Sequence, residues 1–246
     1  MSAFLRRLFA RRTSASTTEK RPAVGAAASE NGDDFDWMLP PRTLVDPAPW
    51  DEYWRDQLTH GAAGFVHMFC DDGKLVDLMR ANELRTVLCI GSGISLEPRA
   101  LAWAGFDVTA LDLSPFAMDM AQRATPSDED LAGLVGGRSP VPNGHAEFVV
   151  GDLCRVEVCP GPYDVVIERK TLQLYPEEER PAAIKAATDR LALRGIFFSH
   201  CHDGGWRPPA PPRHRLEPWF VAEDWKFLSG DTPLTERVAW LFTSTG

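Results

Sequence analysis

Short apolar runs alternate with amphipathic stretches along residues 85–199. The runs are bounded by glycine or polar residues and are therefore predicted to be strands; they occupy residues 85–90, 107–111, 147–150, 163–167 and 196–199. The stretches between them carry apolar residues at helical spacing and are predicted to be helices; they occupy residues 96–104, 115–123 and 178–193. Residues 125–144, rich in Gly, Pro and Ser, are predicted to be a loop. Strands that alternate with helices indicate an α/β protein with a parallel sheet covered on both faces.

The segments on either side follow different patterns. Before the alternation, helices are predicted to begin near Pro49 and to span residues 72–84. After it, apolar runs at 225–228 and 237–243 are separated by a Ser-Gly-Asp-Thr-Pro turn and no helix. This pattern predicts a terminal hairpin whose last strand is antiparallel to the sheet.

Length and composition are those of an ordinary globular domain. The chain has 246 residues, of which 44% are hydrophobic and 25% are charged. No apolar run approaches the about 20 residues needed to cross a bilayer, so stable membrane insertion is not expected. The five cysteines show no C-x-x-C spacing, which indicates reduced thiols. We therefore expect a soluble cytoplasmic protein, and the sequence does not indicate its oligomeric state.

Charge is distributed unevenly along the chain. The formal net charge is −9, although residues 1–24 carry six Arg or Lys and one Glu. Residues 1–33 are predicted to form a disordered basic tail; the alternative is a short amphipathic segment that touches an anionic membrane or acts as an organelle presequence. Because the rest of the chain is acidic, binding to nucleic acid is not expected.

The sharpest motif is a glycine turn at the end of the first predicted strand. The apolar run leads into Gly91-Ser92-Gly93 and then directly into a helix that Ser95 can cap. Glycine permits a positive φ and leaves room for a ligand against the backbone. Asp112 follows 19 residues after Gly93, at the end of the next strand. An acid at that spacing can accept hydrogen bonds from both hydroxyls of a ribose.

Two more predicted strands end in polar residues. Asp152 follows the strand at 147–150, and Glu168 with Arg169 follows the strand at 163–167. Ligands in open α/β sheets bind at the carboxyl ends of the strands, near the switch in strand order. The sequence therefore predicts one crevice framed by four strand ends.

The region from Val87 to Ser199 resembles the class I S-adenosylmethionine-dependent methyltransferases in the order of these motifs. The resemblance implies a doubly wound, mostly parallel, seven-stranded sheet with a C-terminal antiparallel hairpin, and S-adenosylmethionine as cofactor. It implies a methyltransferase domain at 85–246, preceded by an N-terminal helical cap segment at 34–84. The cofactor contacts that it implies fall on Gly91, Ser92, Gly93, Asp112, Leu113, Asp152 and Leu153.

The chain departs from related patterns at three positions. The methyltransferase family usually has an acid where this chain has Cys89, and a third glycine where it has Ser95. A nicotinamide dinucleotide fingerprint, G-x-G-x-x-G, would require glycine at Leu96, so nicotinamide use is disfavoured.

A weaker resemblance reaches the N-terminal segment. Trp50 and Trp54 resemble the W-x-x-x-W region of thiopurine-type methyltransferases, and residues 168–172 resemble their D-R-x-x-L. In that branch the aromatics close over the cofactor and the arginine meets it, which implies such roles for Trp50, Trp54 and Arg169. The alternative for the tryptophans is core packing. Residues 168–172 also resemble D-K-G-T-L of some protein-lysine methyltransferases.

Two residues are candidate bases. A sulfonium methyl is already electrophilic, so a soft anionic acceptor needs positioning alone, whereas an amine or hydroxyl needs a base nearby. The candidates are Glu168 and His200; the alternative for Glu168 is an ion pair with Arg169 or a capping role. His200, Cys201 and His202 could ligate zinc, but no further Cys or His has a suitable spacing, so no metal site is predicted. The alternatives for His200 are the wall of an acceptor pocket and an ordinary strand end.

The favoured function is methyl transfer from S-adenosylmethionine to a small-molecule acceptor. The alternatives are a protein (lysine) methyltransferase, which would need an open acceptor surface, and a non-catalytic nucleotide-binding module of the same fold. The Pro-rich segment at 206–218 follows the fifth predicted strand and is predicted to be a loop; it either borders the crevice or connects elements at the surface.

Overall fold

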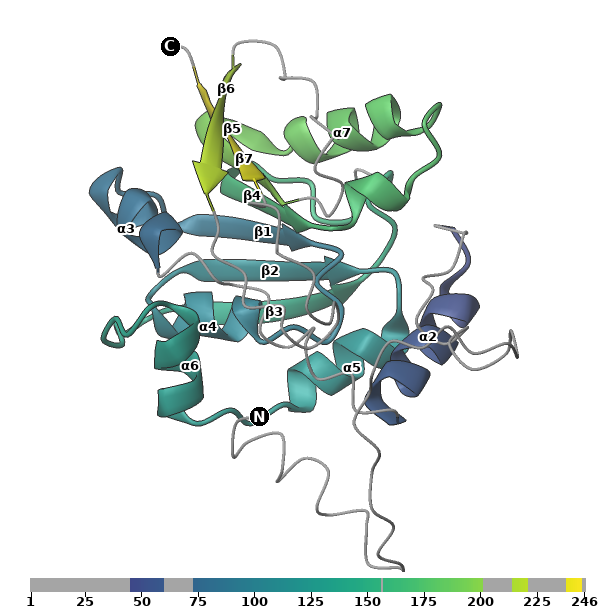
Figure 1. Cartoon of the computed structure of the whole chain (residues 1–246), viewed down its shortest axis with the longest axis horizontal. Coiled ribbons are helices and arrows are strands. Elements are labelled where there is room, and N and C mark those ends of the chain that lie inside the picture. The colour runs from purple at the N-terminus through teal and green to yellow at the C-terminus, as the bar shows by residue number, and fades with distance from the viewer. Residues whose placement is uncertain (1–44, 60–72, 156, 201–213, 221–237, 245–246) are drawn as a thin grey trace, which may run out of the picture.

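The computed structural model describes residues 45–59, 73–155, 157–200, 214–220 and 238–244. The helices are α2 (Pro47–Thr59), α3 (Lys74–Ala81), α4 (Glu97–Trp103), α5 (Pro115–Arg123), α6 (Asp128–Leu134), the 3-10 helix η3 (Leu172–Leu174) and α7 (Arg180–Thr188). The strands are β1 (Thr86–Ile90), β2 (Asp107–Asp112), β3 (His145–Val150), β4 (Tyr163–Arg169), β5 (Leu191–His200), β6 (His214–Phe220) and β7 (Val238–Ser244). Figure 1 shows these strands as one central sheet with helices on either side.

The strands form one sheet in the order β3-β2-β1-β4-β5-β7-β6. The five strands from β3 to β5 are paired in parallel, whereas β7 is antiparallel to both β5 and β6. The chain moves outward from β1 to β3 and then returns to the other side of β1 with β4. This order confirms the predicted α/β class and places the switch in strand order between β1 and β4.

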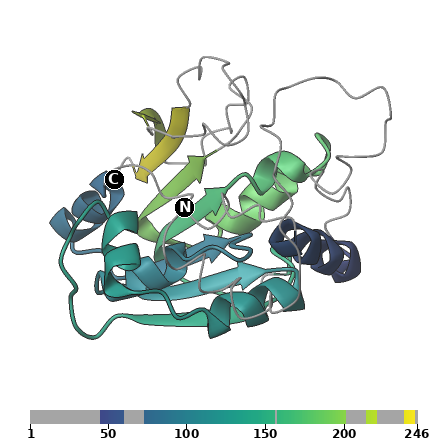
Figure 2. The same ribbon diagram turned by 60° about the horizontal axis from the view of Figure 1, so that its bottom comes forward.

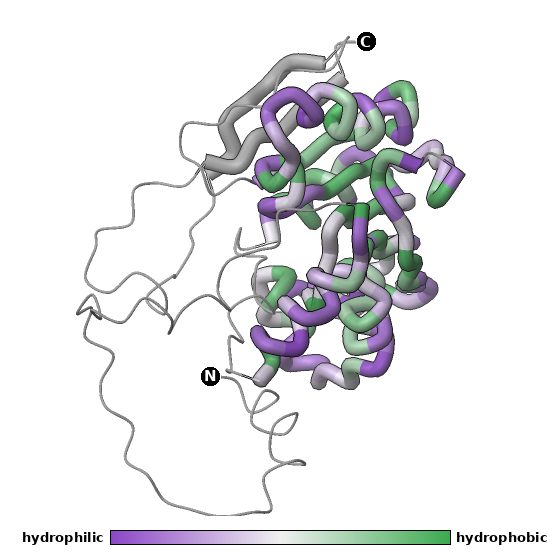
Figure 3. Tube along the Cα trace, turned by 90° about the vertical axis from the view of Figure 1, so that its right-hand side faces the viewer, coloured by the Kyte–Doolittle hydropathy of each residue, from purple (hydrophilic) through white to green (hydrophobic). Residues whose placement is uncertain are grey.

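Two hydrophobic clusters cover the two faces of the sheet. Cys89 and Ile167 pack with residues of α3, α4, α5 and α6 on one face, while Leu88 and Val166 pack with residues of α7 on the other. Figure 2 shows α7 on one side of the sheet and α4, α5 and α6 across it, and Figure 3 shows hydrophobic residues gathered along the inner strands. Successive residues of a strand point to opposite faces of the sheet. Only end residues of β4 and β5 that point to the same face can therefore contact each other.

Two predicted boundaries were wrong within the doubly wound region. The segment at 178–193 is not one helix, because α7 ends at Thr188 and Leu191 already pairs with Tyr163 in the sheet. The segment at 125–144 is not a continuous loop, because it contains α6. Ser127 and Asp130 form a reciprocal capping box at the start of α6, which stabilises a helix too short for its periodicity to show.

The hairpin is antiparallel as predicted, but its first strand lies elsewhere. It is formed by β6, inside the segment predicted to be a Pro-rich loop, and residues 225–228 lie outside the described part of the chain. A proline is tolerated in β6 because this strand forms the edge of the sheet, where one row of backbone groups has no neighbouring strand. The basic tail, residues 201–213 and the segment at 60–72 also lie outside the described residues. None of the helices in the described ranges has the length and apolar character to cross a membrane.

A buried arginine ties the loop before β4 to α7. Arg190 is fully buried, and its guanidinium donates to the carbonyl oxygens of Arg155, Val158 and Cys159 at 2.9–3.1 Å and of Ala186 at 2.5 Å. Five N–H groups in a rigid fork suit this task, because they reach several carbonyls at once. The side chain of Arg190 therefore fixes the loop that connects β3 to β4.

We predict that Arg190→Lys destabilises the protein by about 2–4 kcal/mol, because one ammonium cannot reach all four carbonyls and buried acceptors lose their donors. Urea unfolding monitored by circular dichroism measures this loss. Arg194→Lys is the control, since Arg194 is exposed on the neighbouring strand β5. Equal unfolding midpoints for the two variants would show that the guanidinium fork is dispensable.

Candidate functional site

The glycine turn between β1 and α4 has the backbone conformation that the sequence predicts. Gly91 and Gly93 have φ values of +59° and +52°, in the left-handed region. A Cβ at Gly91 would lie 2.0 Å from Oγ1 of Thr171, and one at Gly93 would lie 2.3 Å from a ring carbon of Trp54. Both positions therefore exclude any larger residue, through contacts with the segment after β4 and with α2.

Asp112 ends β2 beside this turn and is bonded to it. Its Oδ2 accepts a hydrogen bond from the Gly93 N–H at 2.8 Å, and its Oδ1 accepts one from the Ser114 N–H at 2.9 Å. The side chain is buried, and burial raises the pKa of Asp112 to about 6, although these amide hydrogen bonds act in the opposite direction. Asp112 is thus a carboxylate whose charge is lost on mild acidification.

The polar groups at this turn fit an adenosyl cofactor. Each oxygen of Asp112 accepts a hydrogen bond from a backbone amide and retains capacity for a further donor such as a ribose hydroxyl. The Ser92 hydroxyl is enclosed, and within the described ranges it has no hydrogen-bond partner. An enclosed hydroxyl without a partner is costly, and a polar ligand at the turn would satisfy it. The residues present therefore suit the sugar and the polar atoms of S-adenosylmethionine.

Helix α2 lies across the end of β2 and beside α5, as Figures 1 and 2 show. Asp51 Oδ1 accepts hydrogen bonds from the Ser114 hydroxyl at 2.5 Å and from the Phe116 N–H at 3.0 Å. The Arg55 guanidinium lies 4.0 Å from the centre of the Phe116 ring. These contacts fix α2 to the first turn of α5.

Both predicted tryptophans are buried on the inner face of α2. Trp50 and Trp54 are each 8% exposed, and both have edge-to-face contacts with Tyr53. Trp54 also belongs to the main hydrophobic cluster and contacts the glycine turn at Gly93. Trp54 therefore packs in the core and contacts the glycine turn, and Trp50 is buried against Tyr53; a role of either ring toward the cofactor stays a prediction.

The residues predicted to lie near the adenine follow β3. The Gly151 N–H donates to the Asp112 carbonyl at 2.9 Å, which brings the end of β3 beside the end of β2. Asp152 is half-buried and accepts a hydrogen bond from the Cys154 N–H at 2.8 Å. Leu153 is buried in the α7-side cluster and Leu113 is half-buried. Asp152 is thus adjacent to the site through its backbone, and its role toward an adenine remains a prediction.

Arg169 forms a buried ion pair with a residue that the sequence reasoning did not select. Its Nε and Nη2 donate to the two carboxylate oxygens of Glu97 at 2.8 and 2.9 Å, with side chains 4% and 6% exposed. Its Nη1 lies 3.3 Å from Nδ1 of His200. A guanidinium has no acceptor, so Nδ1 accepts and we infer that the ring proton lies on Nε2. Cys89 lies near the same pair, and burial together with the Glu97 charge raises the pKa of its thiol.

Glu168 caps the segment that follows β4. Its Oε2 accepts from the N–H groups of Thr171 and Leu172 at 3.1 and 3.2 Å, and its Oε1 accepts from the Ser199 hydroxyl. It is fully buried. These bonds favour the capping interpretation of Glu168 over a base.

The two candidate bases do not share a face of the sheet. Glu168 pairs in register with Ser199, and Arg169 pairs with His200. Because neighbouring strand residues point to opposite faces, Glu168 lies on the α7 side and His200 on the α4 side. The structure therefore separates two side chains that the sequence places at adjacent strand ends.

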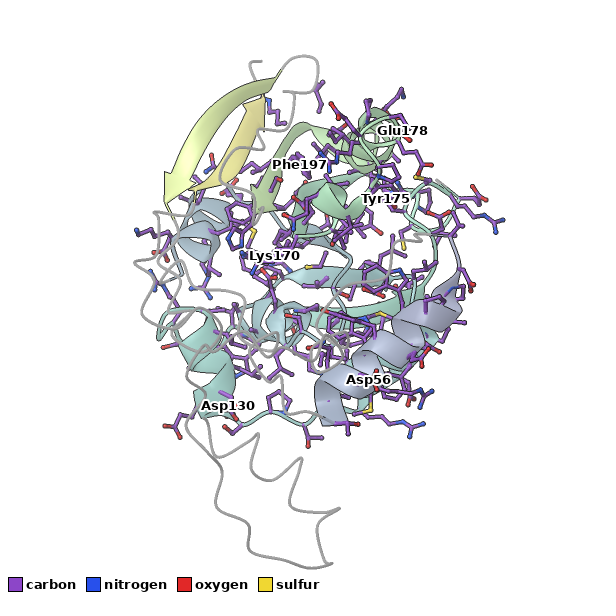
Figure 4. The ribbon with its side chains drawn as sticks, turned by 45° about the vertical axis from the view of Figure 1, so that its right-hand side comes forward. Asp56, Asp130, Lys170, Tyr175, Glu178 and Phe197 are labelled. Atoms are coloured by element: carbon purple, nitrogen blue, oxygen red, sulfur yellow. The ribbon has the colours of Figure 1, made fainter. Side chains whose placement is uncertain are left out.

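Lys170 marks the point where β4 leaves the sheet. It is buried and has a φ of +63°, a conformation that residues other than glycine seldom adopt. Figure 4 shows Lys170 in the interior, whereas Asp56 on α2 and Asp130 on α6 lie at the periphery. The turn directs Thr171 back over Gly91, where its Oγ1 lies 3.4 Å from the Ile90 carbonyl.

Three residues of the site were missed by the sequence reasoning: Asp51, Glu97 and Ser114. Ser114 could have been predicted from the sequence, because serine before proline at the start of a helix is a capping signal. Its hydroxyl accepts a hydrogen bond from the Ala117 N–H at 3.0 Å. Asp51 and Glu97 have partners 63 and 72 residues away along the chain. Such pairs leave no periodic signal in one sequence. Within the described ranges, no group of three or more His, Cys, Asp or Glu residues is arranged to hold a metal ion.

Comparisons with known proteins agree with this geometry. The family model of a methyltransferase domain matches residues 88–199. A search of curated proteins gives no significant match. Among solved structures, a TehB-like SAM-dependent methyltransferase from Corynebacterium glutamicum is 22% identical with a TM-score of 0.51, covering 81% of this chain and 100% of that chain.

Two further structures share the fold at lower identity. The plantazolicin methyltransferase BpumL, solved in complex with SAH, is 12% identical with a TM-score of 0.50, covering 85% of this chain and 93% of that chain. A protein described for the conversion of a disulfide bond into a thioacetal group during echinomycin biosynthesis is 18% identical, also with a TM-score of 0.50, covering 81% of this chain and 93% of that chain. The strand order, the glycine turn with Asp112 and the match of the domain model agree: residues 88–199 match a methyltransferase domain, and the fold is that of S-adenosylmethionine-dependent methyltransferases.

Proposed function

We propose that this methyltransferase acts on a small molecule and that Asp112 binds the ribose of S-adenosylmethionine. The observation that carries the proposal is the placement of α2, which lies over the glycine turn through Trp54 and is fixed to α5 through Asp51. A protein substrate needs an open surface next to the methyl group. A helix fixed across this edge of the sheet favours a smaller acceptor that enters a covered site.

The chain's own residues would bind and position the reactants. When bound, S-adenosylmethionine supplies a methyl group on a positively charged sulfur. Asp112 and the Ser92 hydroxyl would hold polar atoms of the adenosyl part, and the buried tryptophans of α2 would shield the site from water. An indole ring near the site also suits a sulfonium, since aromatic faces attract cations.

The proposed acceptor needs little help in losing a proton. Both oxygens of Glu168 already accept hydrogen bonds from the chain, and Nδ1 of His200 accepts from Arg169. Either group would have to exchange these bonds before it could remove a proton. This favours an acceptor atom that is anionic or soft near neutral pH, such as a thiolate, for which positioning suffices.

We predict that radiolabelled methyl groups pass to small thiols rather than to protein. Purified full-length enzyme and tritiated S-adenosylmethionine would be incubated with a panel of small thiols, amines and phenols and, separately, with a histone mixture. Scintillation counting of extracted products measures transfer, and an incubation without enzyme serves as the blank. Label in the histones with none in the small molecules would contradict the proposed acceptor class.

We predict that Asp112→Ala weakens binding of S-adenosylhomocysteine by about 5- to 150-fold, equivalent to about 1–3 kcal/mol for lost hydrogen bonds to a charged group. Isothermal titration calorimetry at pH 7.5 measures the change. Asp107→Ala is the matched control, because Asp107 is exposed at the opposite end of the same strand. If both variants bind as tightly as the unaltered protein, Asp112 does not hold the ribose.

We predict that affinity for S-adenosylhomocysteine falls about tenfold between pH 7.5 and pH 5, since ribose hydroxyls donate to the ionised carboxylate and the pKa of Asp112 is raised to about 6. The same raised pKa makes the unliganded protein lose stability as pH rises from about 4 to about 6, because the folded state then binds the extra proton. Calorimetry across this pH range tests the first trend. A constant affinity would show that no group with this pKa contacts the ligand.

A further inference from the structure

Two side chains of α2 reach the two backbone segments that hold Asp112. Asp51 and Trp54 are three residues apart and therefore lie on one face of the helix. Asp51 contacts the start of α5 through Ser114 and Phe116, while the Trp54 ring lies against Gly93. One turn of α2 thus touches both neighbours of the carboxylate.

Ser114 connects the carboxylates of α2 and β2. It is fully buried, its N–H donates to Asp112 Oδ1 at 2.9 Å, and its hydroxyl donates to Asp51 Oδ1 at 2.5 Å. The same hydroxyl accepts from the Ala117 N–H at 3.0 Å, which fixes its rotamer. A change at Asp51 therefore reaches Asp112 through one rigid residue.

We propose that Asp51 is a positioning residue of the cofactor site, which orients Ser114 and thereby couples the docking of α2 to the binding competence of Asp112. The inference rests on the proposed role of Asp112 in holding the ribose. No contact between Asp51 and the cofactor is required, because the coupling passes through Ser114. Coupling of this kind is reciprocal: a cofactor that binds ionised Asp112 also favours the docked α2.

The electrostatics of the pair support this coupling. Burial is the main cause of the raised pKa of Asp112, and the negative charge of Asp51 raises it further. Among the charged groups of the described neighbouring segments, Arg55 of α2 lies over the Phe116 ring, Asp119 and Arg123 of α5 pair with each other at 2.8 Å, and Asp152 accepts from a backbone amide. Removing the charge of Asp51 should therefore lower the pKa of Asp112.

Three full-length variants distinguish the effect of the Asp51 charge, the effect of its hydrogen bonds, and the effect of removing any acid from the surface of α2. Asp51→Asn removes the charge but retains an oxygen that can accept from Ser114 and Phe116. Asp51→Ala removes both. Glu52→Gln is the control, because Glu52 is an exposed acid on the same helix. Binding of S-adenosylhomocysteine would be measured by calorimetry at pH 7.5 and pH 5, with circular dichroism to verify that each variant is folded.

We expect affinity to fall about tenfold between the two pH values in the unaltered protein and in Glu52→Gln, and by a smaller factor in Asp51→Asn. Asp51→Ala should also bind more weakly at pH 7.5, by about fivefold or more, because α2 loses its link to Ser114. If Asp51→Ala is folded and binds S-adenosylhomocysteine as tightly as the unaltered protein at pH 7.5, the coupling is overturned while the role of Asp112 stands. If the unaltered protein shows no dependence, the role of Asp112 and this inference fall together.

Discussion

The carboxylate of Asp112 is the constraint on which the carboxyl edge of the sheet depends. It accepts from Gly93 of the glycine turn on one side and from Ser114, two residues after the end of β2, on the other, so it sets the spacing between β1, β2 and the start of α5. Burial makes the ionised form costly, and the two amides compensate for part of this cost. The same group is therefore structural in the unliganded protein and available, through its remaining acceptor capacity, to a ligand with hydroxyl donors.

A second constraint is the two-residue period of β4 and β5. The residues at the ends of these strands are polar, and the alternation sends them to two separate environments. Glu168 and Ser199 point toward α7, where Glu168 holds the turn that follows β4, whereas Arg169 and His200 point toward α4, where Arg169 pairs with Glu97. Both candidate bases, Glu168 and His200, are therefore engaged in hydrogen bonds within the protein. Glu168 stabilises the segment that brings Thr171 over the glycine turn, and Arg169 joins the end of β4 to the start of α4.

Much of the fold could be predicted from the sequence because its signals are local. The parallel strands and the start of α5 follow from apolar runs and a proline at a helix start, and the structure has them where the pattern places them. The failures occurred where local signals compete. Leu191 continues a helical stripe but pairs with Tyr163 in the sheet, and the seven-residue α6 depends on its capping box more than on periodicity. Within the site, the link from Asp51 to Ser114 depends on how two distant segments dock, which a single sequence does not record.

The glycine turn shows why a motif alone cannot distinguish ligand binding from packing. At both glycines a Cβ would collide with a side chain of the protein itself, Thr171 or Trp54, so these positions would require glycine whether or not a cofactor binds. The polar atoms are more informative. Packing does not account for the acceptor capacity that Asp112 retains beyond its two amide hydrogen bonds, nor for an enclosed hydroxyl at Ser92 that has no partner among the described residues. Both features cost stability unless a polar ligand uses them, and the assignment of this edge to cofactor binding therefore rests on these two side chains rather than on the glycines.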